Sequence, residues 1–199
     1  MSKILGYGED TLTYWALRKR ISEILKELND PSVPSDCLIF FRPSFGRGKE
    51  GFGEFDAILA SSEDVYLIES KWDKSTKDEI KLDKKQILRH KIFSWYFVKW
   101  DAQRYKNWKE FSDAHREDFT AKFACKKIVP EGKLLAQNLE YILNKLHKHC
   151  KKVKKPRNIL LYFYGGGSKR ATLTRGDVDF EVINIDYGQY TQGNFIPLD

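Results

Sequence analysis

Apolar residues recur at helical spacing near the start of the chain, between residues 9 and 29. The sequence Asn29-Asp30-Pro31 ends this pattern, so we predict one amphipathic helix over that range. A short apolar run at residues 37–44 predicts a strand. The glycine-rich, basic segment FGRGKEGFG comes directly after it and predicts an exposed loop.

Two further strands are predicted at residues 54–60 and 65–72, and the short connection between them favours an antiparallel hairpin. Beyond Trp72 the chain is charged and then rich in aromatic residues, and we predict helices there and another over residues 134–149. The segments 158–164 and 179–185 predict the last two strands, with Gly165-Gly166-Gly167 in the loop between them. This order of elements predicts an α/β fold with a central mixed β-sheet flanked by α-helices.

The aromatic residues between Phe93 and Phe111 have two interpretations. They could stack on exposed bases, as in single-strand binders. Such density is more often found in a hydrophobic core, and we favour a core here.

The hairpin carries the candidate chemistry. Side chains alternate along a strand, so Glu69 and Lys71 share one face and Ser70 points to the other. If the loop between the strands has two or four residues, the numbers of paired positions sum to 125, and Asp56 lies opposite Glu69. A loop of three or five residues would place the two acids on different faces. Two acids and a lysine are therefore predicted to converge.

Two neighbouring carboxylates are costly unless a cation lies between them or one is protonated. A divalent ion such as Mg²⁺, or Mn²⁺ in its place, suits these hard oxygen ligands. Metal-bound water beside a lysine fits the hydrolysis of a phosphodiester. The alternative is a solvent-facing ion pair between Glu69 and Lys71, but the apolar residues before them indicate a strand buried on both faces.

Asp56, a turn and then Glu69-Ser70-Lys71 resemble the signature of the restriction-endonuclease-like PD-(D/E)XK nuclease superfamily. The chain also has Gly8-Glu9-Asp10 at the start of the first predicted helix and Gly53-Glu54-Phe55-Asp56 before the second strand, which resemble segments of some members. Residue 55 is Phe where the signature has Pro, a residue often missing in the superfamily. The resemblance covers residues 8–90.

This resemblance implies a restriction-endonuclease-like sheet that carries a metal-dependent nuclease site. Asp56 and Glu69 would bind the metal together with the backbone carbonyl of Ser70, and Lys71 would assist catalysis. Glu9 would be the acid on the first helix, and Gln86 would match a glutamine that members often have on the helix after the site.

Several basic residues are candidates for contact with nucleic acid. Three of them lie in or next to the glycine-rich loop, namely Arg42, Arg47 and Lys49. Four more follow the motif on the next predicted helix, namely Lys84, Lys85, Arg89 and His90. The basic segment at residues 151–157 is a further candidate, and a solvated helix end explains it equally well.

Length and composition support one domain over residues 1–199, with a formal charge of +7 that suits an anionic partner. The three cysteines have unrelated spacings, which suits a reducing compartment. The sequence also shows no apolar leader and no apolar run long enough to span a membrane. We therefore expect a cytoplasmic protein with no membrane partner. The partner would be DNA, with RNA as an alternative, and a homodimer is possible. The competing functions are a non-catalytic nucleic-acid-binding module with the nuclease fold and a protein that binds partners through its aromatic region.

Overall fold

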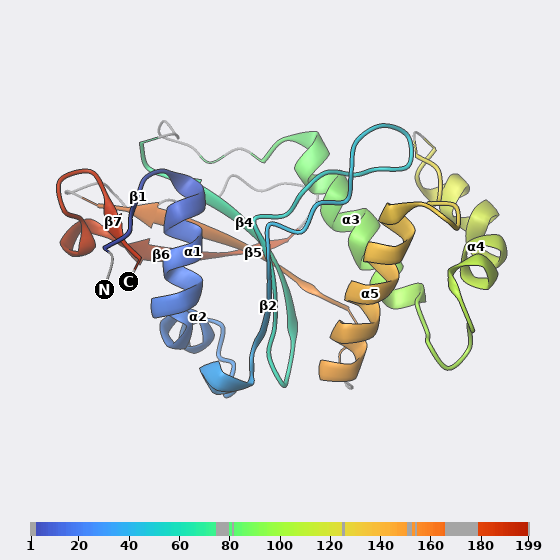
Figure 1. The fold of residues 1–199 in the computed structure, drawn as a ribbon, viewed down its shortest axis with the longest axis horizontal. Helices are drawn as coiled ribbons and strands as arrows, with labels where there is room; N and C mark the ends of the chain where they lie inside the picture. The colour runs from blue at the N-terminus through green and yellow to red at the C-terminus, as the bar shows by residue number, and fades with distance from the viewer. Residues whose placement is uncertain are drawn as a thin grey trace.

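A five-stranded sheet lies at the centre of the protein, in the order β2-β3-β4-β5-β6 (Figure 1). The structure is a computed structural model that describes residues 3–74, 80, 82–124, 126–150, 153, 155–165 and 179–198. The strands are β2 (Leu38–Phe41), β3 (Ala57–Ala60), β4 (Val65–Trp72), β5 (Arg157–Tyr164) and β6 (Phe180–Asp186). The pairs β2–β3 and β3–β4 are antiparallel, and the pairs β4–β5 and β5–β6 are parallel. The predicted mixed sheet of an α/β fold is confirmed.

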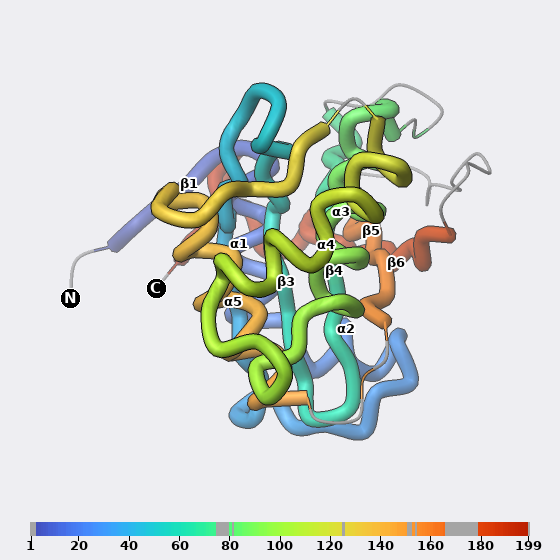
Figure 2. The backbone as a smooth tube through the Cα atoms, turned by 90° about the vertical axis from the view of Figure 1, so that its right-hand side faces the viewer, coloured from blue at the N-terminus to red at the C-terminus, as the bar shows by residue number. Residues whose placement is uncertain are grey.

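Helices cover both faces of this sheet. One face carries α1 (Glu9–Lys19) and α2 (Ile21–Glu27), and the other carries α3 (Lys84–Lys99) and α5 (Leu134–His149), with α4 (Trp108–Lys122) packed outside them (Figures 1 and 2). Two 3₁₀ turns, Pro34–Asp36 and Gly188–Tyr190, and a small second sheet of β1 (Leu5–Gly6) and β7 (Ile196–Pro197) complete the described elements.

The prediction of one helix over residues 9–29 is wrong, because the helix breaks at Arg20. The backbone of Arg20 leaves helical geometry, with φ −122° and ψ 13°, and its guanidinium binds Glu23 in the next turn and the hydroxyl of Tyr190. The change of direction lets both short helices bury apolar side chains in the same core on this face of the sheet.

The central strand β4 is buried on both faces, as its apolar run predicts. Val65 and Leu67 belong to the core beneath α3 and α5, whereas Tyr66 and Ile68 belong to the core beneath α1 and α2. The aromatic residues of the charged and aromatic region lie in the first of these cores, so the core interpretation is confirmed for Phe93, Trp95, Tyr96, Phe97, Trp100, Tyr105, Trp108 and Phe111.

The register of the hairpin decides where the candidate acids lie. Ala57 pairs with Ile68 and Ala60 with Val65, so the paired positions sum to 125 as predicted. Asp56 lies one position beyond the last pair of β3 and therefore opposite Glu69.

Among the described residues, no helix is long and apolar enough to cross a membrane.

Candidate active site

Asp56 is held at the end of β3 by the neighbouring strand. Its Oδ2 accepts a hydrogen bond of 2.7 Å from the backbone N–H of Ser70. Burial raises the pKa of the Asp56 carboxyl to about 7, and the negative charges of Glu69 and Glu9 add to this effect. The site therefore contains a carboxyl group that is costly to ionise without a nearby cation.

Glu69 lies opposite Asp56 and is 1% exposed. Its two oxygens accept hydrogen bonds from three side chains of α3: Nε2 of Gln86 at 2.9 Å, Nη2 of Arg89 at 2.7 Å and Nε2 of His90 at 3.0 Å. Burial by itself would raise the pKa of Glu69, but the hydrogen bond and charge of His90, the Arg89 charge and the Gln86 bond together lower it. Glu69 is thus a buried, ionised carboxylate with a full set of donors.

The start of α3 positions these donors. Gln86, Arg89 and His90 are spaced three and four positions apart and so share one helix face. Asp83 caps the helix by accepting from the N–H of Gln86, while Oε1 of Gln86 accepts from the N–H of Asp83. This capping box leaves the Nε2 of Gln86 free to donate to Glu69.

His90 connects Glu69 to β5. Its Nδ1 lies 2.7 Å from Oδ1 of Asn158, and its Nε2 donates to Glu69. Both ring nitrogens thus lie within hydrogen-bond distance of side-chain oxygens on neighbouring strands. The ring also packs against Phe55 and Phe180, which keeps it out of solvent.

Lys71 and Glu9 complete the cluster from β4 and the first turn of α1. The Nζ of Lys71 lies 3.9 Å from Oε1 of Glu9, and both side chains are partly exposed. Thr13 joins the two elements, because its hydroxyl contacts both the backbone carbonyl of Glu9 at 2.9 Å and the Ser70 hydroxyl at 2.7 Å. As predicted, Ser70 points to the opposite face of β4 from Glu69.

The donor chemistry of this cluster fits a hard divalent cation in part. Asp56 and Glu9 supply carboxylate oxygens, and the carbonyl of Ser70 faces the same strand edge as its N–H, toward Asp56. The oxygens of Glu69, however, are taken by Arg89, His90 and Gln86. Within the described part of the chain no three acidic, histidine or cysteine side chains are preassembled for a metal. Glu69 would join a metal site only if Arg89 moved away.

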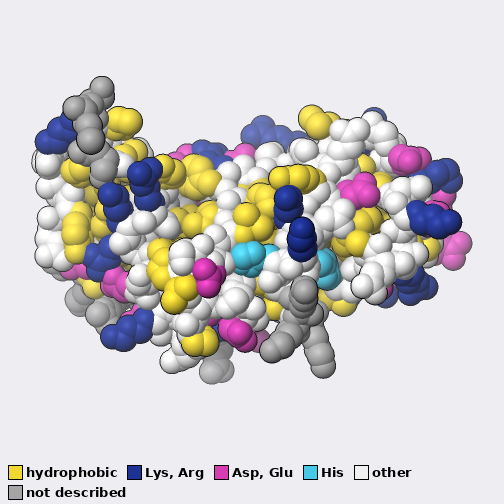
Figure 3. All heavy atoms as spheres, turned by 60° about the horizontal axis from the view of Figure 1, so that its bottom comes forward, with side chains coloured by type: hydrophobic (Ala, Val, Ile, Leu, Met, Phe, Trp, Pro, Cys, Tyr) yellow, Lys and Arg dark blue, Asp and Glu magenta, His cyan; other side chains and the backbone are white. Residues whose placement is uncertain are grey.

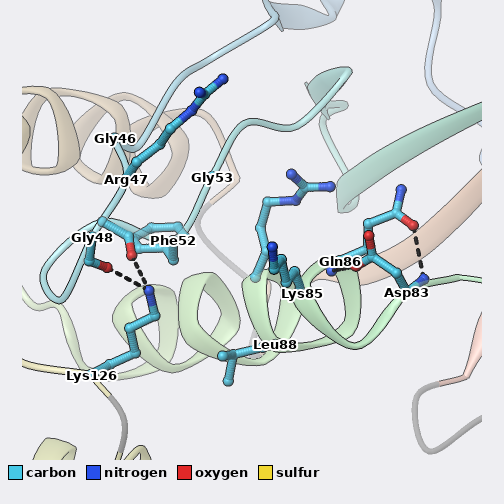
Figure 4. Close-up of a pocket in the computed structure, with 12 residues that line it drawn as sticks. Gly46, Arg47, Gly48, Phe52, Gly53, Asp83, Lys85, Gln86, Leu88 and Lys126 are labelled. Carbon is cyan, nitrogen blue, oxygen red and sulfur yellow. Dashed lines mark hydrogen bonds between the residues drawn. The ribbon is translucent and has the colours of Figure 1, made fainter.

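A basic pocket of about 670 Å³ opens between the glycine-rich loop and the start of α3 (Figure 4). The glycine-rich loop forms one wall, and the first turns of α3 form the other. Its lining residues are Gly46, Arg47, Gly48, Gly51, Phe52, Gly53, Asp83, Lys85, Gln86, Leu88, Arg89 and Lys126. Because Gln86 and Arg89 both line the pocket and bind Glu69, the pocket and the carboxylate cluster are continuous.

The glycine-rich loop is anchored to the protein on one side. Phe45 and Phe52 stack with ring centroids 4.8 Å apart and are buried against α3. The ammonium of Lys126 donates to the carbonyls of Gly48 and Gly51, at 2.7 and 2.5 Å (Figure 4). The predicted exposed loop is therefore a hairpin-like extension whose aromatic residues are buried and whose basic tip is exposed.

The predicted contacts to nucleic acid have different surroundings. The side chains of Arg47, Lys49, Lys84 and Lys85 are exposed. Arg42 is exposed as well, but it pairs with Asp10 and Glu54.

Arg89 and His90 are committed to Glu69, and a direct contact of His90 with a ligand on the surface does not fit its 1% exposure. In the basic segment at 151–157, Lys151, Lys152 and Lys154 lie outside the described residues, and Arg157 pairs with Asp64 and Glu181.

Five residues that the sequence predicts for the site lie in one cluster, namely Asp56, Glu69, Lys71, Glu9 and Gln86. The contact of Thr13 with Ser70 and the binding of Arg89 and His90 to Glu69 were not predicted. The spacing of residues 86, 89 and 90 was an available signal, since these positions share a helix face.

Comparisons of the chain with known protein-family models, with curated proteins and with solved structures find no match.

Proposed function

We propose that this protein is a metal-dependent nuclease of the restriction-endonuclease-like fold that hydrolyses phosphodiester bonds in DNA. The observation that carries the proposal is the convergence of Asp56, Glu69, Lys71 and Glu9 at one end of the central strands, next to a basic pocket. The resemblance of these residues to the PD-(D/E)XK signature supports the same conclusion.

The carboxylates of Asp56 and Glu9, with the carbonyl of Ser70, would hold Mg²⁺ or Mn²⁺. When bound, such an ion supplies a water of lowered pKa and offsets the charge of the phosphate. Burial and the neighbouring acids raise the pKa of the Asp56 carboxyl and so disfavour its ionised form. A bound cation would stabilise that ionised form.

Lys71 is the side chain best placed to act on the reacting group. Its ammonium lies beside Glu9, on the strand that also carries Glu69, and it is partly exposed. It would orient the attacking water or donate hydrogen bonds to the negative charge that develops on the phosphate. Thr13 positions this pair by tying the first turn of α1 to Ser70.

The basic pocket would receive the substrate backbone next to the site. Lys85 on α3 and Arg47 on the loop lie on opposite walls (Figure 4). Phosphate contacts of this kind give affinity that falls with rising salt concentration.

One observation favours the non-catalytic module as a second candidate. The carboxylate of Glu69 is already satisfied by Gln86, Arg89 and His90, as a structural acid would be. Such a protein would bind nucleic acid through the basic pocket without cutting it.

The test is cleavage of plasmid, linear, branched and single-stranded DNA and of RNA with Mg²⁺ or Mn²⁺. We compare the wild type with Asp56→Asn and Lys71→Met, and use Lys26→Met, an exposed lysine of α2, as the matched control. Metal-dependent cleavage that both site variants abolish and the control retains supports the nuclease. Salt-sensitive binding without cleavage supports the module, and a protein that neither binds nor cuts contradicts both.

A further inference from the structure

A second pocket, of about 600 Å³, lies between α3, the end of α4 and the start of β5. It is lined by Leu88, His90, Lys91, Ser94, Trp95, Val98, Lys99, Lys122, Phe123, Lys155 and Asn158. Only Leu88 is shared with the pocket beside the carboxylates. The nuclease proposal does not use this second pocket.

Its rim is strongly positive. Four lysines from three parts of the chain, Lys91, Lys99, Lys122 and Lys155, surround it, and none of its described lining residues is acidic. Lys99 pairs with Asp118 at 3.2 Å, whereas the other three lysines make no ion pair within the described ranges. Like charges gathered around one pocket repel each other, and an anion bound between them would remove that repulsion.

Its wall is apolar and aromatic beneath this rim. Trp95 and Phe123 line the pocket but are each only 5% exposed, and the exposed Val98 lines it as well. The indole of Trp95 lies near Asp118, which also pairs with Lys99. The hydroxyl of Ser94 adds a hydrogen-bond donor and acceptor to the lining.

A cationic rim over an apolar wall with a few polar groups matches a phosphate joined to a flat, partly apolar body. A nucleotide has both parts, because its phosphate suits the lysines and its base suits an apolar, aromatic surface. An inorganic anion would use the rim but would leave the apolar wall uncovered. Figure 3 shows one face of the molecule, on which basic side chains lie singly or in pairs among hydrophobic ones.

The pocket is connected to the candidate active site by hydrogen bonds. Asn158, which lines the pocket, contacts Nδ1 of His90 at 2.7 Å, and Nε2 of His90 contacts Glu69 at 3.0 Å. The same α3 helix contributes Gln86 and Arg89 to the active site and Lys91 and Trp95 to this pocket. A strand bound at one pocket therefore has a second basic site farther along the same helix.

We propose that this pocket binds a nucleotide unit of a nucleic-acid strand, outside the segment that lies at the carboxylates. In naming a nucleic acid as the ligand, this inference rests on the proposed function. The pocket itself is independent of cleavage, so the two proposals can fail separately.

The test measures binding of a labelled single-stranded oligonucleotide by fluorescence anisotropy, with a chelator present so that cutting does not interfere. The variant carries Lys91→Ala, Lys122→Ala and Lys155→Ala, all at exposed positions. The matched control carries Lys19→Ala, Lys26→Ala and Lys145→Ala, which remove the same charge from exposed positions on α1, α2 and α5. Circular dichroism checks that both proteins are folded.

We expect the pocket variant to bind at least about tenfold more weakly than the control. A plot of log affinity against log salt concentration should also be less steep for the pocket variant, by about 2, since each phosphate contact to a single strand contributes about 0.7 to the slope. Equal affinities for the two variants would overturn the inference. Free mononucleotide, titrated by calorimetry, is the second arm. If mononucleotide binds and the oligonucleotide does not, the pocket serves a free nucleotide and the strand assignment is wrong.

Cleavage assays separate this inference from the nuclease proposal. A wild-type protein that cuts nothing, but whose binding depends on the three lysines, contradicts only the nuclease. A wild-type protein that cuts DNA, with a pocket variant that binds like the control, contradicts only the second pocket.

Discussion

The carboxylate of Asp56 accepts a hydrogen bond from the backbone amide of Ser70, so the acid at the end of β3 is fastened to the strand that carries Glu69 and Lys71. This bond holds a carboxyl group in a buried position close to a second acid.

We expect Asp56→Asn to stabilise the fold at alkaline pH. The pKa of Asp56 is about 7 in the folded protein and near its ordinary value of 3.8 when unfolded. Between these two values the folded state binds more protons, so the free energy of unfolding of the wild type falls as pH rises through this range. Asparagine carries no charge and can still accept from Ser70.

The gain should be absent below about pH 4 and complete above about pH 7, with an upper limit of about 4 kcal/mol. Urea denaturation of the two proteins at about pH 5 and about pH 8 measures it. A difference in stability that is independent of pH would show that Asp56 titrates normally.

Arg89→Met should weaken the fold and strengthen metal binding. The substitution keeps the apolar stem but removes the guanidinium that binds both oxygens of Glu69. Because Gln86 and His90 remain as donors, we expect a loss of about 2–3 kcal/mol, less than for a fully unpaired buried charge.

Thermal denaturation with and without Mg²⁺ tests both effects of Arg89→Met. Mg²⁺ should raise the melting temperature of the variant more than that of the wild type, since Glu69 is then free to bind the ion. An equal rise in the two proteins would mean that Glu69 is not a metal ligand.

Thr13→Val should reduce cleavage by acting through Glu9. The hydroxyl of Thr13 joins the start of α1 to Ser70, and its loss leaves the Ser70 hydroxyl without this partner in a buried place. We expect a loss of stability of about 1 kcal/mol and a lower kcat with little change in KM. Thr13→Ser should restore the rate, and a valine variant with wild-type kcat would exclude a positioning role.

Gly51→Ala should disrupt the glycine-rich loop, whereas Gly48→Ala should be tolerated. A Cβ at Gly51 would lie 2.4 Å from the backbone nitrogen of Arg47 and 2.4 Å from the carbonyl carbon of Gly46. At Gly48 nothing lies within 4 Å, and the cost comes only from its positive φ of +88°.

We therefore expect a loss of about 2–4 kcal/mol for Gly51→Ala and about 1 kcal/mol for Gly48→Ala. Chemical denaturation compares them, and hydrogen exchange at Phe52 and Gly53 locates the change, because the amides of both residues bond across the loop. Similar losses in the two variants would contradict the close packing of this turn.

Much of this architecture follows from local patterns in the sequence. The helix predicted over 134–149 is α5 with the same bounds, and the strand predicted over 65–72 is β4. The register that places Asp56 opposite Glu69 was predicted from the alternation of side chains along a strand and from the short turn. Each of these depends on neighbouring residues and on periodicity.

The features that the sequence did not predict depend on distant contacts. Arg20 breaks the first helix where its side chain meets Tyr190, far along the chain. Likewise, Arg89 and His90 look like basic surface residues until the helix is placed on β4, where both find Glu69. A charged residue on a helix says little about its partner until the tertiary packing is known.

The two neighbours of β4 come from very different distances along the chain. It pairs with β3 across the short turn at residues 61–64, but with β5 only through a loop of about ninety residues, since Tyr66 lies beside Arg157. Contacts between distant residues form slowly because the loop must close first. We therefore expect Asp56 and Glu69 to meet earlier in folding than Asn158 and His90. The hydrogen bonds that hold Glu69 would then be completed only after the hairpin that carries it has formed.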